Sequence, residues 1–275
     1  MTMALSDPEF DYVRRLVYEG SSIVLEPSKH YLVETRLIQV AREIGLQTVS
    51  DLIARMRTTR TEGLQNKVVE AMTTNETSFF RDIHPFEALK TEVLPKLIEA
   101  RKATQTINIW SAACSTGQEA YTIGMVLREH FPACSSWKIR ILCTDLSQEV
   151  IAKAKEGRFS QLEVNRGMPA ALLVKYFKRD GLTYLVSDEL RKLVDFRELN
   201  LAKTWTGIPT MDIVFLRNVL IYFDVETKKR ILAQVRSTLR ADGVMLLGGA
   251  ETTINLDDAF LRVPVGKASC YRMKA

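Results

Sequence analysis

From about residue 106 onward, short apolar segments alternate with helical segments, and this alternation constrains the fold more than any other feature of the chain. Apolar runs of strand length lie at 107–111, 138–144, 211–216 and 244–248. Helical patterns lie between them or beside them, at 118–129, 148–156 and 225–239. Strands that alternate with helices are typical of a parallel sheet with helices on both faces. The sequence therefore predicts an α/β domain over residues 76–275.

The first 75 residues have a different pattern. Apolar side chains recur there at helical spacing, first at Phe10, Val13 and Val17 and again over residues 32–44. Ser50, which precedes an acidic first turn, is typical of a helix N-cap. We therefore predict a separate N-terminal helical domain of about four helices over residues 1–75.

One segment interrupts the alternation inside the α/β domain. Asp180 and Gly181 lie between apolar flanks, and this pair is typical of a tight hairpin turn. A second strand-like segment follows at 193–197. We therefore predict a small antiparallel β insertion at about 177–197.

Composition narrows the classes of partner. The net charge of +5 favours an acidic partner through long-range attraction. No dense run of Lys and Arg carries interleaved aromatic residues, so we expect no nucleic-acid partner. No stretch approaches the roughly 18 apolar residues of a membrane span, and residues 1–10 lack the apolar core of a signal peptide. We therefore expect a cytoplasmic protein with no direct membrane insertion.

The cysteines and histidines follow no metal-binding or disulfide pattern. The four cysteines form no CxxC pair, and the three histidines are scattered singly along the chain. We therefore expect reduced, mostly buried thiols and no metal site.

Candidate ligand-binding residues follow the predicted strands, because ligands of open α/β sheets bind beyond the carboxyl ends of the strands. Segment 111–119 is rich in small residues, which let the backbone approach a ligand closely. Asp145 follows the next strand, where an acidic side chain can accept hydrogen bonds from both ribose hydroxyls of a nucleoside. Two further segments of this kind contain Asn200, Leu201, Arg217 and Asn218.

The chemical character of segment 111–119 favours one cofactor over another. It contains no GxGxxG phosphate-binding motif and carries the acidic Glu119. A carboxylate repels a pyrophosphate but attracts the ammonium group of S-adenosylmethionine, so the segment favours S-adenosylmethionine over NAD. Two plainer interpretations stay open. The segment can be an ordinary strand-to-helix connection, and Asp145 can be a helix N-cap together with Ser147.

Three segments together resemble a known family. They read MTTNETSFFR at 72–81, WSAACSTGQEAY at 110–121 and RNVLIYF at 217–223. In this order and spacing they resemble the CheR family of chemotaxis-receptor glutamate O-methyltransferases. The resemblance implies a small N-terminal helical domain followed by a Rossmann-like class I methyltransferase domain with a small antiparallel β insertion. It also implies methyl transfer from S-adenosylmethionine to glutamate side chains of chemoreceptors, which leaves S-adenosylhomocysteine.

The resemblance further implies roles for individual residues. The cofactor site would be lined by Asn75, Thr77, Arg81, Glu119, Asp145, Asn200, Leu201, Arg217 and Asn218. Asp145 would hold the ribose and Glu119 would face the methionine ammonium group. Arg81 would lie near the transferred methyl group, and Tyr222 would project towards the reacting centre, so these two are the catalytic candidates. For Tyr222, a buried aromatic at a strand end stays an alternative.

The same resemblance suggests how the receptor binds. Its acidic methylation region would meet basic residues of the N-terminal helical domain, namely Lys29, Arg36 and Arg42. Arg55, Arg57 and Arg60 form a further basic cluster. The alternative is an ordinary solvated helix face. Some members capture a receptor tail peptide by strand addition at a longer loop of the insertion, and the short turn at Gly181 argues against tail-peptide tethering here.

Other functions stay open because a fold does not fix a function. The main alternative is a class I methyltransferase that acts on nucleic acid or a small molecule, although the N-terminal helical domain and the three motifs argue against it. A second is a non-catalytic regulator that binds S-adenosylmethionine, although Arg81, Asp145 and Tyr222 are all present. A nicotinamide-dependent oxidoreductase is a distant third.

Overall fold

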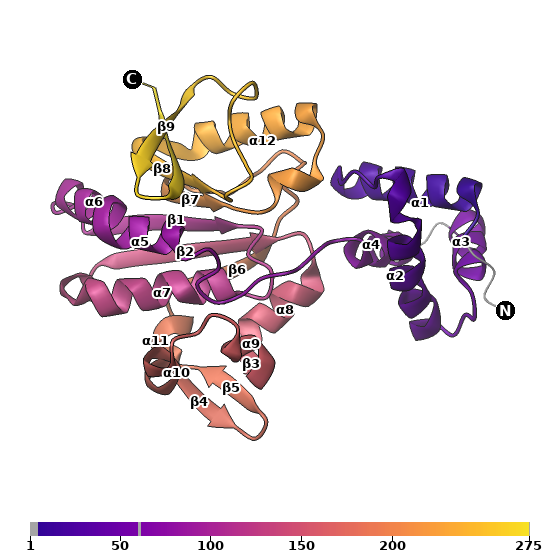
Figure 1. The fold of residues 1–275 in the computed structure, drawn as a ribbon, viewed down its shortest axis with the longest axis horizontal. Helices are drawn as coiled ribbons and strands as arrows, with labels where there is room; N and C mark the ends of the chain where they lie inside the picture. Colours follow the sequence, from indigo (N-terminus) through magenta and orange to yellow (C-terminus); the bar gives the residue numbers. More distant parts are fainter. Residues whose placement is uncertain (1–4, 60–61, 275) are drawn as a thin grey trace. The chain divides into compact units, whose positions relative to one another are not determined.

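The computed structural model describes residues 5–59 and 62–274, and the chain divides into two compact units (Figure 1). The first unit comprises Met1–Thr74 together with Tyr222–Thr227. The second comprises Asn75–Ile221 and Lys228–Ala275. Residue 60 of the basic cluster lies outside the described residues.

The first unit contains the N-terminal helices. Their bounds are α1 (Asp7–Ser21), η1 (Pro27–Lys29), α2 (His30–Glu43), α3 (Val49–Thr58) and α4 (Glu62–Ala71). Phe10, Val13 and Val17 are buried on one face of α1, as the helical spacing predicts. α1 packs on α4, and α2 packs on both α3 and α4. The predicted all-helical N-terminal region is therefore confirmed.

The start of α3 differs from the prediction. The N-cap is Thr48 and not Ser50, because the Thr48 side chain accepts a hydrogen bond from the backbone N–H of Asp51 at 3.1 Å. Val49, the first helical residue, is buried. The helix therefore begins two residues earlier, where an apolar residue can join the core.

The second unit contains a seven-stranded sheet in the order β6-β2-β1-β7-β8-β10-β9. The strands are β1 (Thr106–Ala112), β2 (Lys138–Asp145), β6 (Val194–Glu198), β7 (Met211–Leu216), β8 (Leu239–Leu247), β9 (Phe260–Val265) and β10 (Ala268–Met273). The first five in this order are parallel, and β10 is antiparallel to both neighbours. The C-terminal hairpin of β9 and β10 carries no strong apolar run and was not predicted.

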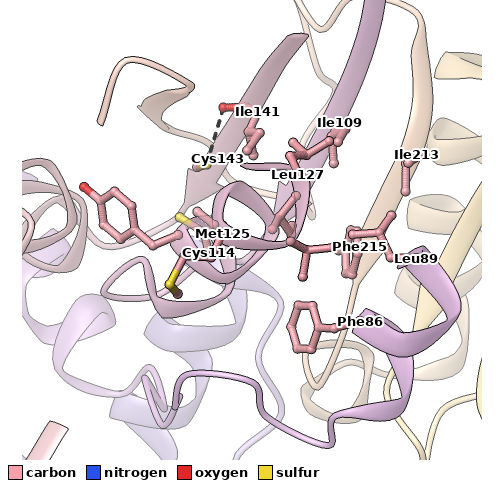
Figure 2. Packing of buried hydrophobic residues seen from close by; sticks show 14 of the residues in the cluster. Phe86, Leu89, Ile109, Cys114, Met125, Leu127, Ile141, Cys143, Ile213 and Phe215 are labelled. Atoms are coloured by element: carbon pink, nitrogen blue, oxygen red, sulfur yellow. Dashed lines mark hydrogen bonds between the residues drawn. The ribbon is translucent and has the colours of Figure 1, made fainter. Parts of the chain in front are cut away.

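Helices cover this sheet (Figure 1). They are α5 (His84–Ala88), η2 (Leu89–Val93), α6 (Leu94–Ala100), α7 (Gln118–His130), α8 (Gln148–Glu156) and α12 (Val225–Thr238). Two 3-10 helices lie in loops, η3 (Pro132–Cys134) after α7 and η4 (Leu220–Tyr222) after β7. α5, η2 and α6 follow one another without a break, and η2 is a π-helical turn. Figure 2 shows Phe86 and Leu89 of this stretch packed with Ile213 and Phe215 of β7. The predicted α/β class is confirmed.

The antiparallel insertion is placed differently from the prediction. It comprises β3 (Arg158–Ser160), α9 (Gln161–Asn165), α10 (Ala170–Tyr176), β4 (Phe177–Asp180) and β5 (Thr183–Val186), with the sheet order β3-β5-β4. After it, α11 (Asp188–Arg191) leads to β6. The prediction of an insertion reaching residue 197 was wrong, because β6 pairs parallel to β2 in the main sheet. Phe196 of β6 is buried there, 5.9 Å from the Tyr121 ring.

A buried carboxylate ties together the amino ends of the central strands. Asp212 is almost fully buried, and it accepts hydrogen bonds from Arg101 Nε at 2.9 Å and from the backbone N–H of Asn108 at 2.8 Å. Arg240 Nε lies 3.1 Å from the same carboxylate. Arg101 also pairs with Asp242, and this hydrogen bond lowers the pKa of Asp242 below its ordinary value.

Replacing Arg101 by methionine is expected to lower the free energy of unfolding by about 1–3 kcal/mol, because a buried acceptor loses one of its donors. Arg240 remains as a second cation, which limits the loss. Urea denaturation followed by circular dichroism measures the change. The matched control is Lys102→Met, since Lys102 is exposed and pairs with Glu99 on the surface. Equal stability of the two variants would contradict the role given to this network.

Candidate functional site

The loop after β1 has an unusual backbone. Ala113, Ser115 and Gly117 all have positive φ, at 63°, 50° and 94°. For the two residues that are not glycine this conformation costs about 1–3 kcal/mol each, and such costs concentrate at functional sites. At Gly117 a Cβ atom would lie 3.1 Å from Ala154 Cβ and 3.2 Å from the Phe196 ring, so only glycine fits. The loop therefore brings its backbone close to the carboxyl ends of β1 and β2.

Asp145 is the last residue of β2 and holds this loop. One carboxylate oxygen accepts a hydrogen bond from the backbone N–H of Ser115 at 2.8 Å, and the other from that of Ser147 at 3.1 Å. The N-cap of α8 is Ser147, whose side chain accepts from the N–H of Val150. Of the pair proposed as an N-cap, Ser147 is the cap and Asp145 supports it through the Ser147 backbone N–H, while the buried Asp145 carboxylate also connects the loop to the end of β2.

Glu119 lies in the first turn of α7 and is held from two sides. It accepts a hydrogen bond from the Ser111 hydroxyl at 2.7 Å and forms a 2.7 Å ion pair with Arg217. Arg217, whose side chain is 2% exposed, also donates to the Arg81 carbonyl and to the Asp82 carboxylate, both at 2.9 Å. These contacts bring together three of the residues that the sequence predicted.

The Phe79-Phe80 pair anchors the segment that begins at Asn75. Phe79 is buried against Phe159 and Phe177, with ring centroids 5.0 Å and 5.6 Å away. The Ser115 hydroxyl donates to the Asn75 carbonyl at 2.7 Å. The segment therefore lies against the loop after β1.

Arg81 and Thr77 lie in the same segment, and both side chains are partly buried. The Arg81 guanidinium donates to the carbonyl of Glu76 at 2.6 Å, which folds its side chain back over the segment. On either side of Arg81, Phe80 and Asp82 have positive φ, at 51° and 63°. This strained turn brings the Arg81 carbonyl to the Arg217 guanidinium, from which it accepts a hydrogen bond.

Asn200 and Leu201 follow β6, as predicted. Asn200 Oδ1 accepts from the backbone N–H of Ala202 at 2.9 Å, which closes a short turn. Leu201 is buried, and its carbonyl accepts from the indole N–H of Trp205 at 3.1 Å. Trp205 in turn meets Trp110 edge to face at 4.9 Å. The turn after β6 is therefore held rigidly beside β1.

Asn218 follows β7 with a positive φ of 56°. Its backbone N–H donates to the carboxylate of Glu251 at 2.8 Å. Glu251 is buried in the loop after β8, and the sequence analysis missed it because that loop has no motif and the acidic residue stands alone.

Tyr222 and the predicted receptor-binding residues belong to the first unit. The Tyr222 carbonyl accepts from the backbone N–H of Val24 at 2.9 Å. Lys29 ends η1, directly before α2, and it is exposed. Arg42 is exposed in the last turn of α2.

Arg36, which was predicted to bind the receptor, has a half-buried side chain that is engaged within the first unit. Its guanidinium donates to the Thr73 carbonyl at 2.7 Å and to the Ala71 carbonyl at 3.3 Å, and so caps the end of α4. Burial lowers its pKa from the ordinary value. The side chain is therefore part of the structure of the first unit.

The second unit has paired charged side chains that suit ligand binding, and its buried cysteines do not suit nucleophilic catalysis. Burial raises the pKa of Cys114 and of Cys143 well above the usual thiol value, so both are neutral and poor nucleophiles. Among the described residues, no group of three or more His, Cys, Asp or Glu side chains could hold a metal ion.

In the same part of the chain, no helix is long and apolar enough to span a membrane.

Comparisons with known proteins agree with this arrangement. Residues 75–268 match the family model described as "CheR methyltransferase, SAM binding domain", and residues 8–73 match "CheR methyltransferase, all-alpha domain". The chain is 39% identical to chemotaxis protein methyltransferase 1 of Pseudomonas aeruginosa, over 99% of this chain and 100% of that protein. It is 36% identical to chemotaxis protein methyltransferase Cher2 of Pseudomonas putida, over the same shares.

Proposed function

Because the chain belongs to the CheR family of S-adenosylmethionine-dependent methyltransferases, we propose that it methylates glutamate side chains of chemoreceptors. The observation that supports this most is the pair of carboxylates beside the loop after β1, Glu119 and Asp145. Their chemistry suits a ligand with an ammonium group and a ribose. The residues present therefore fit the cofactor that the family binds.

Each residue has a proposed role in holding this cofactor. Asp145 accepts hydrogen bonds from the ribose hydroxyls, and Glu119 faces the methionine ammonium group. Arg217 keeps Glu119 in place through their 2.7 Å ion pair. Asn75, Thr77, Asn200, Leu201 and Asn218 complete the lining.

The proposed reaction requires few catalytic groups from the protein. S-adenosylmethionine supplies a methyl group on a cationic sulfur, so that a glutamate oxygen forms the new C–O bond while the C–S bond breaks and its electron pair stays on sulfur. A glutamate on the receptor surface is already ionised at neutral pH, so no general base is needed. Alignment of the reacting atoms can contribute ~7–11 kcal/mol. Arg81 and Tyr222 are proposed to position the carboxylate and the methionine end of the cofactor.

Incubation with radiolabelled S-adenosylmethionine tests the proposed function. One reaction contains membranes with chemoreceptors, one contains RNA and one contains no acceptor. Base-labile label on the receptors is expected, because a glutamate methyl ester is cleaved by base. Label on RNA would favour the alternative methyltransferase, and cofactor binding without transfer to any acceptor would favour the non-catalytic regulator.

The receptor is proposed to meet exposed basic residues of the first unit. Lys29 and Arg42 are exposed, whereas Arg36 is engaged with backbone carbonyls. Acidic helices attract such residues, and salt screens the attraction beyond about 8 Å at physiological ionic strength.

Charge reversal at Arg42 is therefore expected to reduce receptor methylation severalfold at low salt and to leave affinity for S-adenosylhomocysteine unchanged. Initial rates at several salt concentrations measure this effect, and the wild-type rate should fall as salt rises. Lys267→Glu is the matched control, since Lys267 is exposed in the turn between β9 and β10. Rates that are indifferent to both salt and Arg42→Glu would favour a merely solvated helix face.

The insertion is proposed to work without a receptor tail peptide. β4 and β5 are joined only by Gly181 and Leu182, and Gly181 has a φ of 59°. Strand addition needs side-chain pockets beside a free edge, and so short a turn supplies few. Calorimetric titration with a tail peptide is expected to give no heat of binding. Micromolar binding that is lost on changing Gly181 would contradict this expectation.

A further inference from the structure

Glu251 gathers four backbone N–H groups on one buried carboxylate. One oxygen accepts from Val219 at 2.9 Å and from Leu220 at 2.7 Å. The other accepts from Asn218 and from Gly248, both at 2.8 Å. Hydrogen bonds to an ionised acceptor are about twice as strong as neutral ones. This carboxylate therefore fixes the loop after β7 against the loop after β8.

The packing around Glu251 leaves little freedom. A Cβ atom on Gly248 would lie 2.7 Å from Glu251 Oε2 and 2.8 Å from Asn218 Nδ2, so a side chain at this position would collide with both. Asn218 is meanwhile held with φ at 56°, in the left-handed region that Asn enters more readily than most other residues with a side chain. The hydrogen bond from its backbone N–H to Glu251 holds the loop in this conformation.

We infer that Glu251 is a positioning residue, which acts on the cofactor through Asn218 without touching it. This inference rests on the proposed function, in which Asn218 lines the S-adenosylmethionine site. Asn218 follows Arg217 directly, so the loop that Glu251 fixes also continues from the residue that holds Glu119. Loss of the carboxylate releases Asn218 from its backbone conformation and weakens cofactor binding.

Glu251→Gln is the sharpest test, because it keeps the size of the side chain and turns one acceptor atom into a donor. The expected result is an increase of about tenfold in the Kd for S-adenosylhomocysteine, measured by calorimetry on the folded protein. Hydrogen exchange of residues 218–220 should rise in the same variant. Unchanged affinity would overturn the inference.

Two further variants separate positioning from stability. Asp212→Asn changes a buried carboxylate at the opposite end of β7 and should lower the melting temperature while leaving the Kd unchanged. Asn218→Gly keeps the backbone conformation, which glycine adopts freely, but removes the side chain. If Glu251 acts through Asn218, adding Glu251→Gln to Asn218→Gly raises the Kd little further.

The outcomes distinguish this inference from the proposed function. Wild-type protein that does not bind S-adenosylhomocysteine would overturn both. Wild-type binding with an equal Kd in Glu251→Gln, or with fully additive effects in the double variant, would overturn the inference alone. The inference alone would also be overturned if Asp212→Asn raised the Kd as much as Glu251→Gln does, because a general loss of stability would then explain both increases.

Discussion

Replacing Arg217 by methionine is expected to lower the free energy of unfolding by about 3–5 kcal/mol, because it leaves a buried ion-pair partner uncompensated. The Arg217 side chain is 2% exposed and that of its partner Glu119 is 12% exposed. Water can therefore solvate little of the Glu119 carboxylate after the guanidinium is removed. The Arg81 carbonyl and Asp82 lose a donor in the same change. Methyl transfer should be lost together with stability, since Glu119 no longer keeps its place.

Urea denaturation and calorimetry with S-adenosylhomocysteine measure the two effects. The matched control is Arg140→Met, because Arg140 is exposed on β2. Adding Glu119→Gln to Arg217→Met should restore part of the stability, since it removes the unpaired buried charge. It should not restore binding of the cofactor. Stability of Arg217→Met equal to that of Arg140→Met would refute the role given to this ion pair.

Replacing Asp145 by alanine is expected to weaken binding of S-adenosylhomocysteine by about 1.5–3 kcal/mol, the usual contribution of hydrogen bonds to a charged acceptor. The variant also releases the backbone N–H of Ser115, so the loop after β1 loses an anchor. Calorimetry on wild-type and variant protein gives the difference directly.

Two comparisons show whether the charge or the loop matters. Asp145→Asn keeps one oxygen acceptor and should bind with intermediate affinity. Asp195→Ala, on the neighbouring strand β6, removes a half-exposed carboxylate paired with Arg197 and should bind as wild type does. Affinity of Asp145→Ala equal to wild type would mean that the ribose assignment is mistaken.

Much of this arrangement was predictable, because the end of an apolar run in the sequence predicts the end of a strand. Once the strand at 138–144 is recognised, Asp145 must lie at the carboxyl edge of the sheet, as it does. The small residues after β1 predicted a close approach of the backbone to a ligand, and that stays a prediction; the structure shows Gly117 crowded by the side chains of Ala154 and Phe196. Local pattern was sufficient to place Asp145, because strand and loop adjoin in sequence.

The remaining features depend on partners that are distant in sequence. The segment at 193–197 is a strand in either sheet, and only its pairing with β2 decides between them. Arg36 looks like any basic helix residue until the end of α4 folds back onto it. Glu251 is an isolated carboxylate whose four donors come from residues 218–220 and from Gly248. Neither residue spacing nor composition reveals contacts between residues that are distant in sequence.

The most direct measurement is mass spectrometry of receptor peptides after incubation with S-adenosylmethionine and wild-type or Asp145→Ala protein. The account predicts that wild-type protein adds one methyl group to glutamate side chains in the cytoplasmic methylation region and that base removes it. It predicts little or no such product with Asp145→Ala. Methyl groups on other residue types, or equal modification by both proteins, would contradict glutamate methylation at this site.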